Sequence, residues 1–151
     1  MSTDSPLTTV AKALGVVFMA PVQMKLPHSG REPDVLFIAT ENRDRIEGRY
    51  INGAADLAIE VVSPDSRRRD LVHKFQEYAA AGVREYWVID GMKRQATLYG
   101  LGTDGAYHAL SVGKDNVFHS EAVSGLWLRV EWLWQDPQPL LTTVLKEWGV
   151  I

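Results

Sequence analysis

The sequence predicts an α+β domain in which a central helix packs on a single mixed β-sheet. Three observations predict this class: several short apolar segments typical of strands, one amphipathic segment between them, and more strand-like segments after it. The chain has 151 residues, 46% of them hydrophobic, which suits one domain over residues 1–151 with a sizeable core.

The first part of the chain predicts a short helix and two strands. Residues 5–14 begin with Ser5-Pro6, a typical helix start, and carry apolar residues at helical spacing. Residues 16–26 are apolar and β-branched but contain Pro21, which predicts a bent or edge strand. The continuous apolar run at residues 35–39 predicts a strand that is buried on both faces.

The middle of the chain predicts the helix that packs on the sheet. Residues 40–53 are polar and predict a surface connection. The helix expected over residues 66–81 presents Leu71, Phe75 and Tyr78 along one face. Further strands are expected at residues 56–62, 85–90, 95–99, 107–112, 116–118 and 126–134, with a last helix at residues 140–148.

Charge and cysteine content exclude several classes of function. Sixteen lysines and arginines against nineteen aspartates and glutamates give a net charge of −3, which disfavours a general nucleic-acid coat. The chain has no cysteine, so disulfides, thiolate nucleophiles and cysteine zinc sites are excluded, and we expect a cytoplasmic protein. Because the longest apolar stretch is about ten residues and a membrane helix needs about 20, we expect no membrane span.

Two of the expected buried strands carry an acidic residue near one end. Asp34 opens the strand at residues 35–39, and Glu60 lies near the end of the strand at residues 56–62. A carboxylate in an apolar strand loses hydration unless it is paired or binds a cation. Since carboxylate oxygens with open water positions suit Mg²⁺, the two acids are a candidate metal site. The alternative, that each acid only forms a turn or an ion pair, stays open.

The central helix adds a lysine to this pair of acids. Lys74 lies at the edge of the helix face that Leu71 and Tyr78 bury. From there its ammonium group could reach the carboxylates and orient an attacking water or stabilise a phosphorane-like transition state. The alternative is an ion pair with Asp70 one turn earlier, which requires no function.

Three consecutive arginines, Arg67, Arg68 and Arg69, stand at the start of the same helix. The helix dipole disfavours each cation there by about 0.3–1 kcal/mol, so another interaction must offset this cost. Exposed ion pairs with Asp65 and Asp70 would do so, and so would contacts with nucleic-acid phosphates.

Tryptophans gather near the end of the chain. Trp127, Trp132, Trp134 and Trp148 stand among apolar residues, and three of them lie in the last expected strand. We therefore expect them in a core or a dimer interface rather than in a surface that stacks on bases.

Taken together and in order, these residues resemble a known family. The matching segments are residues 33–35 and 56–64, Arg69-Asp70, Lys74, Tyr78, and residues 81–83, 85–87 and 89–90. They are similar to the Uma-type family of bacterial restriction endonucleases, which belongs to the PD-(D/E)xK nuclease superfamily. The resemblance covers residues 33–99 and implies a restriction-endonuclease-like core that hydrolyses DNA phosphodiesters with Mg²⁺, or with Mn²⁺ as a substitute.

The resemblance also implies roles for individual residues. Asp34 matches the motif aspartate and Glu60 the acid of the (D/E)xK element, both as metal ligands. The motif lysine would stand at position 62, which is Val62, and the resemblance places its function on the following helix at Lys74. Candidates for accessory roles are Asp56 and Gln76, and the three arginines are candidates for phosphate contacts.

One feature departs from the superfamily pattern. Many members add a glutamate from an N-terminal helix, whereas no glutamate precedes Glu32 here, so the N-terminal helical part is short or incomplete. The leading hypothesis is a Mg²⁺-dependent endonuclease that acts as a homodimer, since two symmetric sites can cut both strands of a duplex. The alternatives are an inactive nuclease-fold module that binds DNA or a protein, and a purely structural cluster of Asp34, Glu60 and Lys74.

Overall fold

A computed structural model describes residues 14–66 and 68–149, and its central element is a six-stranded mixed sheet. The strand order is β1-β4-β7-β8-β9-β10. The strands are β1 (Gly15–Met19), β4 (Val35–Ala39), β7 (Leu57–Val61), β8 (Glu85–Asp90), β9 (Gln95–Leu101) and β10 (Tyr107–Ala109). Strands β7 and β8 run parallel, and helix α2 (Arg68–Ala81) forms the crossover between them. The expected α+β class, with a helix on a mixed sheet, is confirmed.

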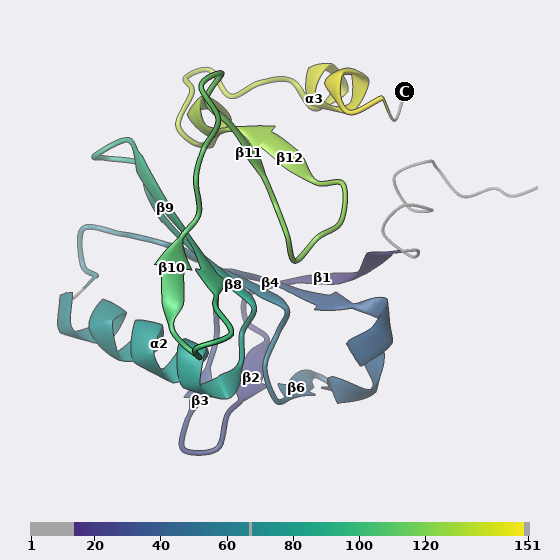
Figure 1. Cartoon of the computed structure of the whole chain (residues 1–151), viewed down its shortest axis with the longest axis vertical. Helices are drawn as coiled ribbons and strands as arrows, with labels where there is room; N and C mark the ends of the chain where they lie inside the picture. Colours follow the sequence, from purple (N-terminus) through teal and green to yellow (C-terminus); the bar gives the residue numbers. More distant parts are fainter. Residues whose placement is uncertain (1–13, 67, 150–151) are drawn as a thin grey trace, which may run out of the picture.

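Helix α2 covers one face of this sheet, as Figure 1 shows. Tyr78 is fully buried against Leu36, Ile38 and Tyr86 of the sheet. The Phe75 ring meets the ring of Tyr99 edge-on, with 5.0 Å between the centroids. Phe75 and Tyr78 of the apolar stripe expected on this helix therefore belong to the first of two cores, and Leu71 is half-buried.

The C-terminal part of the chain covers the opposite face (Figure 1). It contains β11 (Val117–His119), β12 (Trp127–Arg129) and α3 (Leu141–Glu147), with β11 and β12 paired as a separate sheet. Trp87 of β8 packs edge-on against Phe118 of β11, with 5.4 Å between the ring centroids. A second core therefore joins this part to the sheet.

The clustered tryptophans pack within the C-terminal part, as expected. The rings of Trp127 and Trp132 lie 5.7 Å apart, and those of Trp132 and Trp148 lie 6.5 Å apart. The indole N–H of Trp148 donates to the carbonyl oxygen of Trp127 at 2.7 Å. Of the strand expected at residues 126–134, only β12 forms, because the chain then continues into the 3-10 helix η2 (Val130–Leu133).

A small second sheet was not anticipated from the sequence. It has the order β3-β2-β6-β5, formed by β2 (Gln23–Lys25), β3 (Gly30–Arg31), β5 (Ile46–Glu47) and β6 (Tyr50–Asn52). Residues 16–26 therefore form two strands in different sheets, separated near Pro21, while β1 is an edge strand as expected. The polar segment at residues 40–53 holds η1 (Thr40–Arg45), β5 and β6, which are too short to show a clear alternation.

Two expectations fall outside the described residues. These are the helix at residues 5–14, of which only residue 14 is described, and the position of Arg67. Within the described ranges, no helix is long and apolar enough to cross a membrane.

Candidate functional site

The two acids singled out in the sequence face each other across neighbouring strands. Strands β4 and β7 pair antiparallel with Val35 opposite Ile59, and the next step of this register brings Asp34 opposite Glu60. Residues directly opposite in such a pair point to the same face, with their Cβ atoms about 4.5–5.5 Å apart. The Asp34 charge is near enough to raise the pKa of the Glu60 carboxyl. The strands that carry the two acids are therefore neighbours in the central sheet.

Glu60 is buried beneath helix α2, with 6% of its surface exposed. The hydroxyl of Tyr78 donates to Oε1 of Glu60 at 2.8 Å. The ammonium of Lys74 donates to Oε2 at 3.4 Å. Burial raises the pKa of this carboxyl above its usual value, and the Tyr78 hydrogen bond and the Lys74 charge act against that rise. Two donors from one face of α2 thus partly replace the water that the carboxylate has lost.

Asp34 is held by the backbone of the neighbouring strand. Its Oδ2 atom accepts a hydrogen bond from the backbone N–H of Val61 at 2.7 Å. The residue lies just before β4 and is partly buried. One carboxylate oxygen is therefore fixed against β7, next to Glu60.

Lys74 contacts two carboxylates rather than one. Its ammonium lies 3.4 Å from Glu60 and 3.3 Å from Asp70, which is one helical turn earlier. The structure therefore contains both the contact with Glu60 that a shared site requires and the i,i+4 ion pair with Asp70. Because Asp70 also pairs with Lys74, the ammonium can move away from Glu60 and still lie beside a negative charge.

Arg31, which sequence reasoning missed, extends this network. It comes from β3 and forms two hydrogen bonds with the carboxylate of Glu77, at 2.7 and 2.9 Å, and one with Asp70 at 3.3 Å. The Arg31 hydrogen bond is the main cause that lowers the pKa of Glu77 to about 2. A line of alternating charges therefore runs along α2 from Glu77 to Glu60.

The remaining expected site residues lie apart from this cluster. Asp56 precedes β7, at the opposite end of that strand from Glu60, and accepts hydrogen bonds from the Ala39 N–H at 2.7 Å and the Asn42 amide at 2.9 Å. Asp56 therefore fastens the connection after β4. Gln76 is exposed on α2. Val62, at the superfamily lysine position, donates its backbone N–H to Ile89 at 2.8 Å.

A polar groove adjoins the cluster at the beginning of α2. It has a volume of about 560 Å³ and is lined by Ser63, Asp65, Ser66, Arg69, Asp70 and His73. Asp70 is shared between this groove and the Lys74 network. Arg68 and Arg69 are both exposed. An extended polar ligand at the two acids would therefore have room beside Arg69.

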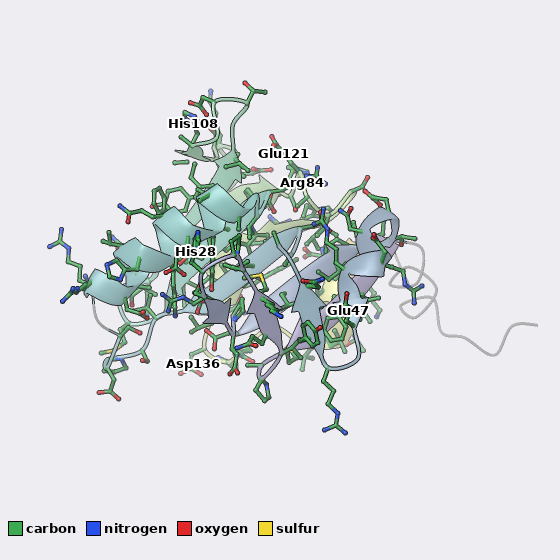
Figure 2. All side chains as sticks on the ribbon, turned by 90° about the horizontal axis from the view of Figure 1, so that it is seen from below. His28, Glu47, Arg84, His108, Glu121 and Asp136 are labelled. Carbon is green, nitrogen blue, oxygen red and sulfur yellow. The ribbon has the colours of Figure 1, made fainter. Side chains whose placement is uncertain are left out.

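The donor set favours one class of metal ion. Within residues 14–66 and 68–149, no three His, Asp or Glu side chains come together as a complete set of metal ligands. The labelled side chains of His28, Glu47, His108 and Asp136 lie well apart in Figure 2. Two carboxylates without nitrogen or sulfur donors do not suit Zn²⁺, but they suit Mg²⁺, which keeps several waters.

Comparisons with known proteins identify the family and the fold of the chain. A family model described as "Uma2: Putative restriction endonuclease" matches residues 6–131. A crystal structure of a "putative nuclease belonging to DUF820" from Anabaena variabilis is similar with a TM-score of 0.69 and 18% identity, over 85% of this chain and 74% of that chain. At this identity the likeness shows the fold alone. No curated protein matches the sequence.

Proposed function

The chain belongs to the Uma2 family of restriction-type endonucleases, and from this premise we propose that it is a metal-dependent endonuclease that hydrolyses DNA phosphodiesters. The observation that carries the proposal is the meeting of Asp34, Glu60 and Lys74 from two neighbouring strands and the helix above them. A cysteine-free chain suits the reducing cytoplasm, where we place this activity.

The charges around the site support binding of a divalent cation. Four carboxylates, those of Asp34, Glu60, Asp70 and Glu77, accompany two cationic side chains, Lys74 and Arg31. Glu77 and Asp70 are paired with Arg31 and Lys74, so the surplus negative charge lies at Asp34 and Glu60. When bound there, Mg²⁺ would neutralise charge on a phosphate and lower the pKa of a bound water.

The protein's own residues take separate roles in this proposal. Asp34 and Glu60 hold the cation, and Glu60 is oriented by Tyr78. Lys74 stands beside the carboxylates, where its ammonium donates to a phosphate oxygen or orients the attacking water. Exposed Arg69, which lines the groove, contacts phosphates there, and this positions the strand without reading its sequence. Arg68, also exposed, is a candidate for a further phosphate contact beside the groove.

A plasmid-cleavage assay with Mg²⁺ or Mn²⁺ tests the proposal. We expect nicking or linearisation by the wild-type chain, loss of cleavage in Glu60→Gln, and full cleavage in Glu121→Gln, which alters an exposed glutamate outside the cluster. A well-folded wild-type chain that retains DNA in a gel-shift assay but never cuts it would favour the inactive binding module instead.

We also propose that the active form is a homodimer, because two sites related by a two-fold axis can cut both strands of a duplex. An apolar groove of about 490 Å³ beside the edge strand β1 supports this, with Val35, Ile59 and Trp148 among its lining residues. Val17 and Met19 of β1 are 56% and 66% exposed. Sedimentation over a range of concentrations tests the dimer, and a monomer throughout would contradict it.

A further inference from the structure

Each of the two carboxylates has one oxygen occupied by a donor of the protein itself. Oδ2 of Asp34 accepts the Val61 N–H at 2.7 Å, and Oε1 of Glu60 accepts the Tyr78 hydroxyl at 2.8 Å. In the part of the chain that the structure describes, Oδ1 of Asp34 accepts no hydrogen bond. Among residues 14–66 and 68–149, Oε2 of Glu60 has only the Lys74 contact, at 3.4 Å. The pair therefore presents one available oxygen from each side chain.

The contact that covers Oε2 is the weakest in the cluster. Charge-assisted N–H···O bonds are typically about 2.7–2.9 Å, so the Lys74 contact at 3.4 Å is a long one. Lys74 also has Asp70 at 3.3 Å as a second partner. Oε2 is therefore the oxygen of Glu60 that an incoming cation can take.

We propose that the Tyr78 hydroxyl restricts Glu60 to a single ligating oxygen, and that this restriction selects Mg²⁺ over Ca²⁺. The inference rests on the proposed metal site. Mg²⁺ demands near-octahedral geometry, keeps several waters and is bound through one or two carboxylates, whereas Ca²⁺ takes six to eight oxygens and often a bidentate carboxylate. Tyr78 is thus a specificity-determining residue that acts through Glu60.

The position of Tyr78 is rigid enough for this role. Its side chain has 0% of its surface exposed, and its ring packs edge-on against Tyr86 with 5.0 Å between the centroids. Because the ring is enclosed between α2 and the sheet, the hydroxyl is held at Oε1. A Glu60 carboxylate that turns to offer both oxygens must give up this hydrogen bond.

Direct metal binding tests the inference without any substrate. Mn²⁺ binding to the full chain is followed by electron paramagnetic resonance, and Mg²⁺ and Ca²⁺ are then titrated as competitors. In Tyr78→Phe we expect Mg²⁺ affinity to fall about tenfold, the usual cost of removing a group that orients a metal ligand. Ca²⁺ affinity should change little because both Glu60 oxygens become available, so the affinity ratio moves about tenfold toward Ca²⁺.

Tyr107→Phe is the matched control. Tyr107 is also buried beside Tyr86, and its hydroxyl donates to the Val83 carbonyl at 2.7 Å, away from the acids. This variant loses a buried hydrogen bond of similar length, so a purely structural effect would appear in it as well. We expect its ratio of Mg²⁺ to Ca²⁺ affinity to equal that of the wild type.

The possible results separate this inference from the proposed function. If Tyr78→Phe does not fold, Glu60→Asp replaces it, because the shorter side chain withdraws from the Tyr78 hydroxyl and should shift the ratio in the same direction. An unchanged ratio in the folded variant overturns the inference and leaves the metal site standing. A wild-type chain that binds no Mn²⁺ overturns the metal site and this inference together.

Discussion

Two glutamates are buried on opposite faces of the central sheet, and they differ in how their oxygens are satisfied. Glu85 of β8 accepts hydrogen bonds from the Ser120 hydroxyl at 2.6 Å, the Trp87 indole at 3.1 Å and the Glu121 backbone N–H at 2.9 Å. Glu60 of β7 has the Tyr78 hydroxyl and the distant Lys74 ammonium, and it faces a second acid.

The difference separates a structural acid from the proposed metal ligand. Three short hydrogen bonds use both oxygens of Glu85, so this carboxylate ties the C-terminal part of the chain to the sheet and has no capacity for a ligand. Glu60 keeps an oxygen with only one weak contact, beside another negative charge. Burial alone therefore does not identify a site, whereas incomplete hydrogen bonding of a buried acid next to another acid does.

Replacing each acid with glutamine is the strongest test of this difference between Glu85 and Glu60. In Glu85→Gln, the new NH₂ group replaces an oxygen that accepted hydrogen bonds, so the donors that faced that oxygen lose their acceptor. Each buried donor left unpaired costs about 1–3 kcal/mol. We expect the free energy of unfolding to fall by about 2–4 kcal/mol in urea denaturation, with cleavage per folded molecule unchanged.

Glu60→Gln should show the opposite pattern. The amide oxygen still accepts from Tyr78, so we expect the stability to change by about 1 kcal/mol or less while cleavage is lost. Two results would reverse the assignment of the two acids. One is a Glu85→Gln variant that keeps its stability but loses cleavage, and the other is a Glu60→Gln variant that is strongly destabilised but cleaves normally per folded molecule.

Lys74→Ala tests the proposed catalytic role of the Asp34, Glu60 and Lys74 cluster. We expect cleavage to fall by about 100-fold, which corresponds to ~2.7 kcal/mol on the barrier, because a donor near the phosphate is removed. Mn²⁺ affinity should not fall, since Lys74 competes with the cation for Oε2 of Glu60 and is not itself a ligand. The stability should change by about 1 kcal/mol, because the contacts of Lys74 with Glu60 and with partly exposed Asp70 are both long, at 3.4 and 3.3 Å.

Arg69→Ala serves as the comparison for this variant, because it removes a nearby exposed cation from the groove rather than from the acids. We expect it to weaken DNA binding, with the effect fading at high salt, and to leave the rate at saturating DNA close to that of the wild type. Undiminished cleavage in Lys74→Ala would remove Lys74 from the site and leave the i,i+4 pair with Asp70 as its role.

Much of the site could be predicted because its residues follow local patterns. Asp34 and Glu60 stand in apolar runs that predict neighbouring strands, and Lys74 stands at the edge of a helical stripe. Tyr78 was expected only as a core residue, although it is one turn after Lys74 and so shares its side of the helix. A tyrosine supplies both an apolar ring and a donor, and only the fold shows which acceptor the hydroxyl reaches.

The rest could not be predicted because it depends on contacts between distant segments. Arg31 reaches Glu77 and Asp70 from a two-residue strand 46 and 39 positions earlier, and no local pattern records such a pairing. Glu85 was expected only as the first residue of a strand, and its burial depends on donors as distant as Ser120, 35 positions later. The small second sheet likewise depends on the parallel pairing of β2 with β6.

A third glutamate, Glu77, extends the comparison, because its contribution to stability should depend on pH. Arg31 lowers the pKa of Glu77 from its usual value of 4.5 to about 2, whereas burial raises the pKa of Glu60. Because the folded pKa of Glu77 lies below the unfolded one, its contribution to stability is complete above pH 4.5 and is lost as the pH falls toward about 2. We therefore expect Glu77→Gln to be less stable than the wild type at neutral pH, with a difference that shrinks through this window. The pair is partly exposed, so solvent screens it and the difference at neutral pH is about 1 kcal/mol or less.

Urea denaturation of the wild type and Glu77→Gln at stepwise lower pH measures this difference, and added salt should reduce it. Glu121→Gln is again the control, since the described residues give its side chain no ion pair and its difference from the wild type should not follow the same window. A Glu77→Gln difference that stays constant from neutral pH to pH 3 would contradict the charge-based account, because a neutral hydrogen bond to Arg31 would then explain the pair equally well. A difference that shrinks as expected would show that Arg31 is held at Glu77 by charge.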